Sequence, residues 1–189
     1  MHKFILRGTF APAFLVFVLY GAVFASDPFV QMGIVKPRER MEAPAFVLRD
    51  IEGGQKGLTD FKGKVILLNF WATWCPNCRE EMPSMEKLWE KFKAKGVVVI
   101  TVAVGSRGKD VESFARELGL TFPMLLDEGR VRRDYEVNAL PMTYLIGKDG
   151  KICGRMYGGR EWAGEGADAL MEHLLQNGLQ SPKGPGQAN

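Results

Sequence analysis

Cysteine and histidine are scarce in this chain, which has three cysteines and two histidines among 189 residues. A domain of this length buries enough surface that it should not depend on disulfides for stability. A structural zinc site needs four nitrogen or sulfur ligands. Besides Cys75 and Cys78, the sequence offers Cys153, His173 and His2, and His2 lies at the extreme N-terminus. The composition therefore argues against structural zinc and leaves the cysteines available for chemistry.

An excess of one charge is also lacking. The 25 Lys and Arg residues are nearly balanced by 22 Asp and Glu residues, the net charge is +3, and the two signs are interspersed. Because nucleic-acid-binding domains carry a basic patch or stripe, we expect no nucleic acid among the partners. With 46% apolar and 25% charged residues, the composition is that of a globular protein with one core, and we expect a monomer.

A long hydrophobic run is present at the N-terminus, from Gly8 to Ser26, and Lys3 and Arg7 precede it. This order is typical of an export segment. Cleavage after Ala25 would make it a signal peptide, whereas its length, close to the ~20 residues that span a bilayer, leaves a retained anchor open. No cysteine ends the run, which excludes a lipid attached there. We expect the protein in the periplasm or on the outer face of the cytoplasmic membrane.

The chain divides into four parts. Residues 1–25 are the expected signal peptide or membrane anchor. Residues 26–42 mix Asp, Pro, Lys, Arg and Glu without a sustained period, which predicts a linker. Residues 43–178 carry the patterns of a folded domain, and residues 179–189, with Pro and Gly, predict a flexible tail.

Strand and helix patterns alternate within the domain. Val65–Trp71 is a continuous apolar run, which predicts a buried central strand. Cys75–Lys95 has apolar residues at helical spacing and ends at Gly96. The other expected elements are strands at 46–48, 97–104, 122–126, 143–146 and 151–157, helices at 110–118 (capped by Asp110), 130–135 and 165–176, and a turn at 50–57. This order predicts an α/β domain with a central mixed β-sheet flanked by helices.

The spacing of Cys75 and Cys78 occurs in zinc sites, structural bridges and redox dithiols. The shortage of ligands argues against zinc, and a bridge that closes so small a loop removes little entropy from the unfolded chain. A redox role fits better. A soft-metal-binding module remains a non-enzymatic alternative, although no Met-rich or His-rich cluster accompanies the pair.

The pair lies where the predicted central strand passes into the predicted helix. Unpaired N–H groups and the helix dipole at a helix N-terminus favour a thiolate, so we expect Cys75 to be the nucleophile. Cys78, one turn further along, is expected to resolve the mixed disulfide with a partner. Pro76 suits the first helical turn because its missing N–H is no loss there.

The segment Phe70–Pro83, which reads FWATWCPNCREEMP, closely resembles the active site of exported, often membrane-tethered thioredoxin-like proteins of the TlpA/ResA type. The resemblance continues through Leu58–Lys64 and Pro141–Ile146 and covers most of residues 43–176. It implies a thioredoxin fold and thiol-disulfide oxidoreductase activity without a metal or organic cofactor.

The resemblance also implies roles for residues around the dithiol. Cytoplasmic thioredoxins carry a buried Asp where this chain has Asn69, which cannot take up a proton. Glu81 aligns with the acidic residue that the TlpA/ResA type places beside the dithiol, so we expect it to help deprotonate Cys78. The alternative is a solvated helix carboxylate. Pro83 is expected to kink the helix.

A second group of residues is expected to meet the partner protein. By the resemblance, Leu140–Pro141 carries a cis peptide bond in a loop facing the dithiol, and the backbones of Leu140 and Met142 are available to pair with an extended segment. Trp74 and Pro76 are expected to form an exposed apolar docking rim.

Three further residues are expected to be structural. Trp71 packs beneath the site, Cys153 is a small buried thiol in a strand, and His173 belongs to the last helix.

The resemblance implies reduction of disulfides in exported proteins, with apocytochrome c before haem attachment as the best single guess for a substrate, and a membrane electron donor that re-reduces the dithiol. An oxidase or isomerase in the same compartment stays open, because the residues between the cysteines do not give the potential. A thiol peroxidase is a further alternative, against which the paired motif argues.

Overall fold

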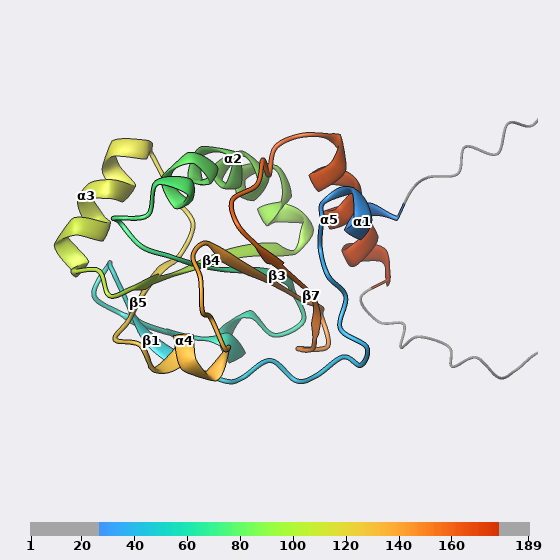
Figure 1. Ribbon diagram of the computed structural model, residues 1–189, viewed down its shortest axis with the longest axis horizontal. Helices are drawn as coiled ribbons and strands as arrows, with labels where there is room; N and C mark the ends of the chain where they lie inside the picture. Colours follow the sequence, from blue (N-terminus) through green and yellow to red (C-terminus); the bar gives the residue numbers. More distant parts are fainter. Residues whose placement is uncertain (1–26, 178–189) are drawn as a thin grey trace, which may run out of the picture.

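The computed structural model describes residues 27–177, which form a seven-stranded sheet with helices on both faces (Figure 1). The strands lie in the order β2-β1-β5-β4-β3-β6-β7. Their bounds are β1 Val47–Asp50, β2 Gln55–Gly57, β3 Val65–Trp71, β4 Val97–Val104, β5 Met124–Asp127, β6 Met142–Ile146 and β7 Ile152–Tyr157. The helices are α1 Pro28–Gln31, α2 Pro76–Phe92, α3 Gly108–Leu118, α4 Arg130–Asp134 and α5 Glu165–Asn177, with short 3-10 turns at Leu58–Phe61 and Lys93–Lys95.

Strands β3 and β4 form the centre of the sheet. Every residue of both strands is buried, as expected for parallel strands covered on both faces. They pair in parallel from Val65 opposite Val97 to Trp71 opposite Ala103. On its other side β3 pairs with the antiparallel β6, and β7 continues the sheet antiparallel to β6. The predicted mixed sheet with helices around it is confirmed.

Two hydrophobic layers hold the helices to the sheet. Alternate residues of a strand point to opposite faces. Leu67 and Trp71 of β3 pack with buried residues of α2, α3 and α5. Leu68 and Phe70 face the other layer, which α4 covers. Asn69, which lies between Leu67 and Trp71 on the same face, therefore points towards α2.

Two local predictions differ from the structure. The expected turn over 50–57 contains β2, which pairs antiparallel with β1; at three residues, Gln55–Gly57 is too short for a strand period to show in the sequence. Helix α3 begins at Gly108, with Arg107 at its N-cap. Asp110 lies in the first turn and forms an ion pair with Arg107, so its predicted capping role is wrong.

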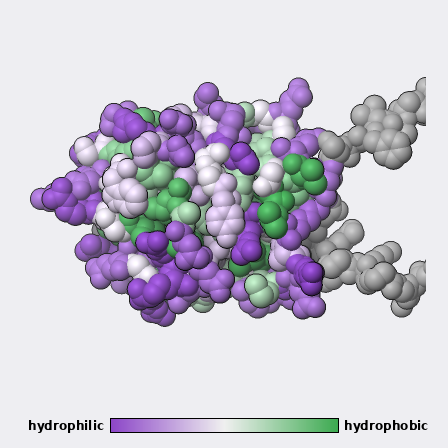
Figure 2. Space-filling view, in the orientation of Figure 1, coloured by the Kyte–Doolittle hydropathy of each residue, from purple (hydrophilic) through white to green (hydrophobic). Residues whose placement is uncertain are grey.

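Residues 27–42, predicted as a linker, lie against the domain. Phe29, Met32 and Ile34 are buried in the layer that also contains α5, and α1 lies beside α5 in Figure 1. The chain then follows the outer edge of β7. Figure 2 shows hydrophobic residues on the surface over α1 and the following segment, where Val30 and Val35 are exposed. The apolar residues between Phe29 and Val35 form too short a run to show a period in the sequence.

The signal or anchor segment 1–25 and the tail 179–189 lie outside the described residues. Within residues 27–177, no helix is long and apolar enough to cross a bilayer.

Candidate active site around Cys75 and Cys78

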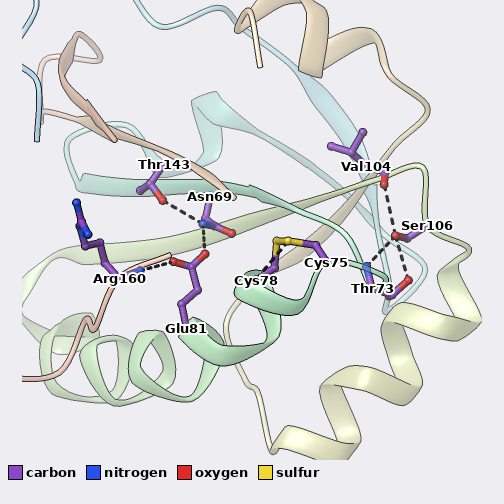
Figure 3. The surroundings of a disulfide bond; sticks show 9 residues. All are labelled: Asn69, Thr73, Cys75, Cys78, Glu81, Val104, Ser106, Thr143 and Arg160. Atoms are coloured by element: carbon purple, nitrogen blue, oxygen red, sulfur yellow. Dashed lines mark hydrogen bonds between the residues drawn. A yellow bond between two sulfur atoms is a disulfide. The ribbon is translucent and has the colours of Figure 1, made fainter. Parts of the chain in front are cut away.

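Cys75 and Cys78 form a disulfide at the point where β3 passes into α2 (Figure 3). Their Cα atoms are 5.3 Å apart. Cys75 is the N-cap of α2, and the backbone N–H of Cys78 points to its Sγ at 3.3 Å. Pro76 occupies the first helical position, where its missing N–H is no loss. Cys75 is 6% exposed and Cys78 is fully buried, so a partner reaches Cys75 first.

The loop before the dithiol is tied to the loop after β4. The backbone N–H of Thr73 donates to Ser106 Oγ at 3.2 Å, and Ser106 Oγ lies 3.4 Å from the carbonyl oxygen of Val104 (Figure 3). These bonds connect the carboxyl ends of β3 and β4, which are neighbours in the sheet. Ser106 is 33 residues from Thr73 in sequence, and nothing in the sequence marked it.

Glu81 is buried beneath the dithiol, with 3% of its surface exposed. Its carboxylate accepts three hydrogen bonds. Asn69 Nδ2 donates to Oε1 at 2.9 Å, whereas the backbone N–H of Arg160 and Trp162 Nε1 donate to Oε2 at 3.1 and 3.3 Å. Figure 3 shows the Glu81 side chain and Cys78 on the same side of α2, both directed towards β3. The alternative, that Glu81 is a solvated helix carboxylate, is therefore wrong.

The protonation of Glu81 is set by opposing influences. Removal from water raises the pKa of this carboxyl from 4.5 to about 7, because burial disfavours the charged form. The hydrogen bonds from Asn69, from the Arg160 main chain and from Trp162 each act to lower the pKa. Glu81 is therefore able to take up and release a proton near neutral pH.

Asn69 links Glu81 to the sheet. Its Nδ2 also donates to Thr143 Oγ1 of β6 at 3.0 Å, while its Oδ1 is buried without a hydrogen-bond partner. The donors Arg160 and Trp162 lie 79 and 81 residues after Glu81. Both residues belong to the connection between β7 and α5. A local sequence pattern does not reveal that this connection lies beside Glu81.

Helix α2 continues through Pro83 to Phe92, so its first turn and the Glu81 turn belong to one helix. A cleft of about 430 Å³ opens beside this helix and is lined by Asn77, Glu80, Glu81, Gly159, Arg160 and Glu161. A Cβ on Gly159 would lie 3.0 Å from the Asn77 carbonyl oxygen, so a larger residue would push this segment away from the first turn of α2.

The Leu140–Pro141 peptide bond is cis, as the resemblance implied. Pro141 is buried and its carbonyl accepts from the Gly158 N–H at 2.9 Å. Leu140 is half-buried, and among the described residues no hydrogen bond involves its backbone. Met142 is different: it is fully buried inside β6, between Phe70 and Tyr157 on the flanking strands. The expectation that its backbone is available to a partner is therefore wrong.

The two candidate rim residues are on the surface. Trp74 is 68% exposed and Pro76 is exposed beside it. Trp71 is fully buried, and its ring lies 4.6 Å from that of Phe114, between centroids. Trp74 is thus exposed and Trp71 buried, as the sequence predicted.

Cys153 is separate from the dithiol. It lies on β7, half-buried, with its Sγ 3.3 Å from the Leu145 carbonyl oxygen. Burial raises the pKa of this thiol to about 11, so it stays protonated at neutral pH. Within residues 27–177, His, Cys, Asp and Glu side chains form no group of three or more that would hold a metal ion.

The chain is similar to known thiol-disulfide oxidoreductases. Residues 40–154 match the model of the AhpC/TSA family. The thiol-disulfide oxidoreductase ResA of Bacillus anthracis is 41% identical over 143 residues, covering 75% of this chain and 79% of that protein. ResA of Bacillus subtilis is 40% identical over 139 residues, covering 73% and 74%.

A solved structure shows the same fold. The crystal structure of the thioredoxin domain of a thiol-disulfide oxidoreductase from Bacteroides vulgatus matches with a TM-score of 0.63 at 28% identity, covering 71% of this chain and 96% of that chain. The predicted thioredoxin fold is confirmed. The chain therefore belongs to the AhpC/TSA family and, within it, to the ResA/TlpA type of thioredoxin-fold thiol-disulfide oxidoreductases.

Proposed function

We propose that this protein reduces disulfides of exported proteins through Cys75 and Cys78, and that oxidised apocytochrome c is a substrate. The observation that carries the proposal is the position of Cys75 at the N-cap of α2, with the Cys78 N–H 3.3 Å from its sulfur. That N–H and the helix dipole stabilise a Cys75 thiolate, which is the attacking species in disulfide exchange.

The reaction has two exchange steps. The Cys75 thiolate attacks one sulfur of the partner disulfide, a Cys75–partner bond forms, and the other partner sulfur leaves as a thiolate. Cys78 then gives its proton to the Glu81 carboxylate and attacks the Cys75 sulfur. The Cys75–Cys78 disulfide forms and the second partner sulfur leaves as a thiolate. Two electrons pass to the partner, and the enzyme dithiol is oxidised.

Glu81 is the proposed proton acceptor for the second step. Cys78 is fully buried, so bulk water has poor access to its thiol. Glu81 lies one turn further along α2 on the same side (Figure 3), and its pKa of about 7 suits proton exchange at neutral pH.

The exposed surface around Cys75 is the proposed docking site. Trp74 and Pro76 present an apolar rim, and the free backbone groups of Leu140 are placed to pair with an extended partner segment, next to the buried cis Pro141. Such main-chain pairing gives affinity with little dependence on partner sequence.

The cellular setting is part of the proposal. The N-terminal run Gly8–Ser26 supports export, either as a cleaved signal or as a tether, to the periplasm or the outer face of the cytoplasmic membrane. Each turnover oxidises the dithiol, so an electron donor must reduce it again, and we propose that this donor lies in the membrane. We propose that the protein works as a monomer.

A trapping experiment tests the roles of the two cysteines. Cys78→Ser, mixed with an oxidised Cys-x-x-Cys-His peptide from a c-type cytochrome, is expected to accumulate a mixed disulfide through Cys75. Cys75→Ser is the matched control and is expected to accumulate none, because Cys78 is buried. Mass spectrometry of the non-reduced adduct reads out both. Equal trapping by the two variants would contradict the assignment.

The reduction potential tests the direction of electron flow. Equilibration of the Cys75/Cys78 couple against glutathione or dithiothreitol buffers is expected to give a value near that of thioredoxin, about −270 mV. A value near that of the oxidant DsbA, about −120 mV, would show that the protein forms disulfides rather than reducing them.

A further inference from the structure

Trp162 lies in the connection between β7 and α5 and is fully buried. Its backbone N–H donates to Ser84 Oγ of α2 at 2.9 Å, and its indole Nε1 lies 3.3 Å from Glu81 Oε2. Ser84 Oγ in turn donates to the Glu81 carbonyl oxygen at 2.7 Å. The residue is therefore fixed to α2 at two points, and both lead to Glu81.

Trp71 provides an internal comparison. It is also fully buried, but its Nε1 has no hydrogen-bond partner among the described residues. Its ring packs on Phe114. The two tryptophans thus have similar bulk and burial, and they differ in whether the indole N–H meets a carboxylate.

An indole N–H only donates, so it favours the ionised form of the carboxylate it meets. Asn69 has both a donor and an acceptor, and rotation of its amide would serve a protonated Glu81 as well as a charged one. The Arg160 N–H belongs to the main chain, so truncation of the Arg160 side chain leaves it in place. Trp162 is thus the one side-chain donor to Glu81 in residues 27–177 that discriminates between the two forms.

Hydrogen bonds, rather than charged side chains, distinguish the ionised from the protonated form of Glu81. Glu80 on α2 and Arg160 and Glu161 on the β7–α5 connection line the cleft outside it, while β3 and β6 contribute the neutral Asn69 and Thr143. Within the described residues, no charged side chain bonds to the Glu81 carboxylate.

We infer that Trp162 is a positioning residue for the dithiol reaction, because its indole N–H holds the Glu81 carboxylate in the charged, proton-accepting form beside Cys78. The inference rests on the proposed role of Glu81 as proton acceptor. Trp162, 81 positions after Glu81 in sequence, thus controls the pH range in which Glu81 accepts a proton.

The test measures the Glu81 carboxyl directly in the oxidised protein, where no thiol titrates in the dithiol. Trp162→Phe keeps an aromatic ring and removes the N–H, and is expected to raise the pKa of Glu81 by about one unit, the usual weight of one hydrogen bond to a charged group. Trp71→Phe is the matched control and is expected to leave the value within about 0.3 units. Carbon-13 NMR of the Glu81 carboxyl gives both values.

A second measurement needs no variant. In the wild-type protein, the indole N–H resonance of Trp162 is expected to shift with pH at the Glu81 midpoint, while the Trp71 resonance stays constant. An unchanged midpoint in Trp162→Phe, an equal change in Trp71→Phe, or a Trp162 resonance that does not follow Glu81 would each overturn the inference. None of these readouts requires turnover, so they are separate from the test of Glu81 as the proton acceptor.

Discussion

At the scale of single residues, Glu81 shows how a fold makes a base from an ordinary carboxylate. Its burial moves the pKa from 4.5 to about 7, and its three hydrogen-bond donors keep the charged form accessible. A surface glutamate would be ionised at neutral pH but would have little tendency to take a proton from a thiol. The buried position supplies that tendency.

Glu81→Gln is expected to slow the release of partner from the Cys75 mixed disulfide by about 10²-fold at pH 7, because it removes the proposed base. The attack of Cys75 on the partner should change little. Rapid-mixing kinetics of the two steps would separate them. Glu90→Gln, an exposed position on the same helix, is the control. Equal slowing of both steps would argue against a role in resolution.

The same residue predicts a pH dependence of stability. The folded state holds the Glu81 proton more tightly than the unfolded chain, so the contribution of Glu81 to the free energy of unfolding is largest below pH 4.5 and is lost as pH rises through about 7. The shift corresponds to roughly 3 kcal/mol. Urea unfolding of the oxidised wild type and Glu81→Gln at pH 5 and pH 8 should show this fall in the wild type alone. Parallel pH profiles would contradict it.

At the scale of elements, residues 27–42, which include α1, lie across α5 and along β7. We call this segment the strap. Phe29 is 4% exposed, and its ring meets that of His173 edge-on, with centroids 5.7 Å apart. The Ile34 N–H donates to the Phe29 carbonyl at 2.8 Å, and the Val35 N–H donates to that of Arg155 at 2.9 Å. Because the strap is held by these few contacts, we expect it to unfold as a separate unit before the sheet does.

Phe29→Ala is expected to release the strap while the sheet stays folded. Truncation of a buried Phe costs about 3–5 kcal/mol, which we expect to exceed the stability of so small a unit. Hydrogen exchange should lose protection at the amides of Ile34 and Val35 and keep it in β3. Val30→Ala, at a residue that is 73% exposed, is the control. Loss of protection in β3 as well would show that the strap is integral to the core.

The sequence predicted the elements whose patterns are long and local. The apolar run of β3 and the helical spacing of α2 were sufficient to locate the dithiol between them, and the motif placed Glu81 three residues after Cys78. The strap was missed because its apolar residues, between Phe29 and Val35, form too short a run to show a period. The donors Trp162 and Arg160 were missed because their partner lies on another element, and only the folded sheet brings them together.

At the scale of the whole molecule, the fold determines which redox state is more stable. Disulfide and dithiol occupy the same N-terminal turn of α2. The stability difference between the oxidised and reduced proteins is linked to the reduction potential, because a strong oxidant is one whose reduced form is stabilised. The proposed reductant should therefore be more stable with the Cys75–Cys78 disulfide formed.

Urea unfolding of the oxidised protein and of the protein held in excess dithiothreitol is expected to give the higher free energy of unfolding for the oxidised form. Cys153 is free in both and does not bias the comparison. A more stable reduced form would indicate a disulfide-forming enzyme and contradict the proposed direction of electron flow.

The strap also has a consequence for how the molecule behaves towards copies of itself. β7 is the last strand of the sheet, and the strap pairs with two residues on its outer edge: the Arg155 N–H donates to the Val35 carbonyl at 3.0 Å, and the Ile152 N–H donates to the Met41 carbonyl at 2.8 Å. A chain that begins at residue 43 would lack the strap. The backbone groups on the outer edge of β7 would then be unpaired, and the apolar residues that the strap covers would be exposed. Unprotected edges of this kind pair with one another and aggregate. We therefore expect residues 27–42 to protect the protein against self-association.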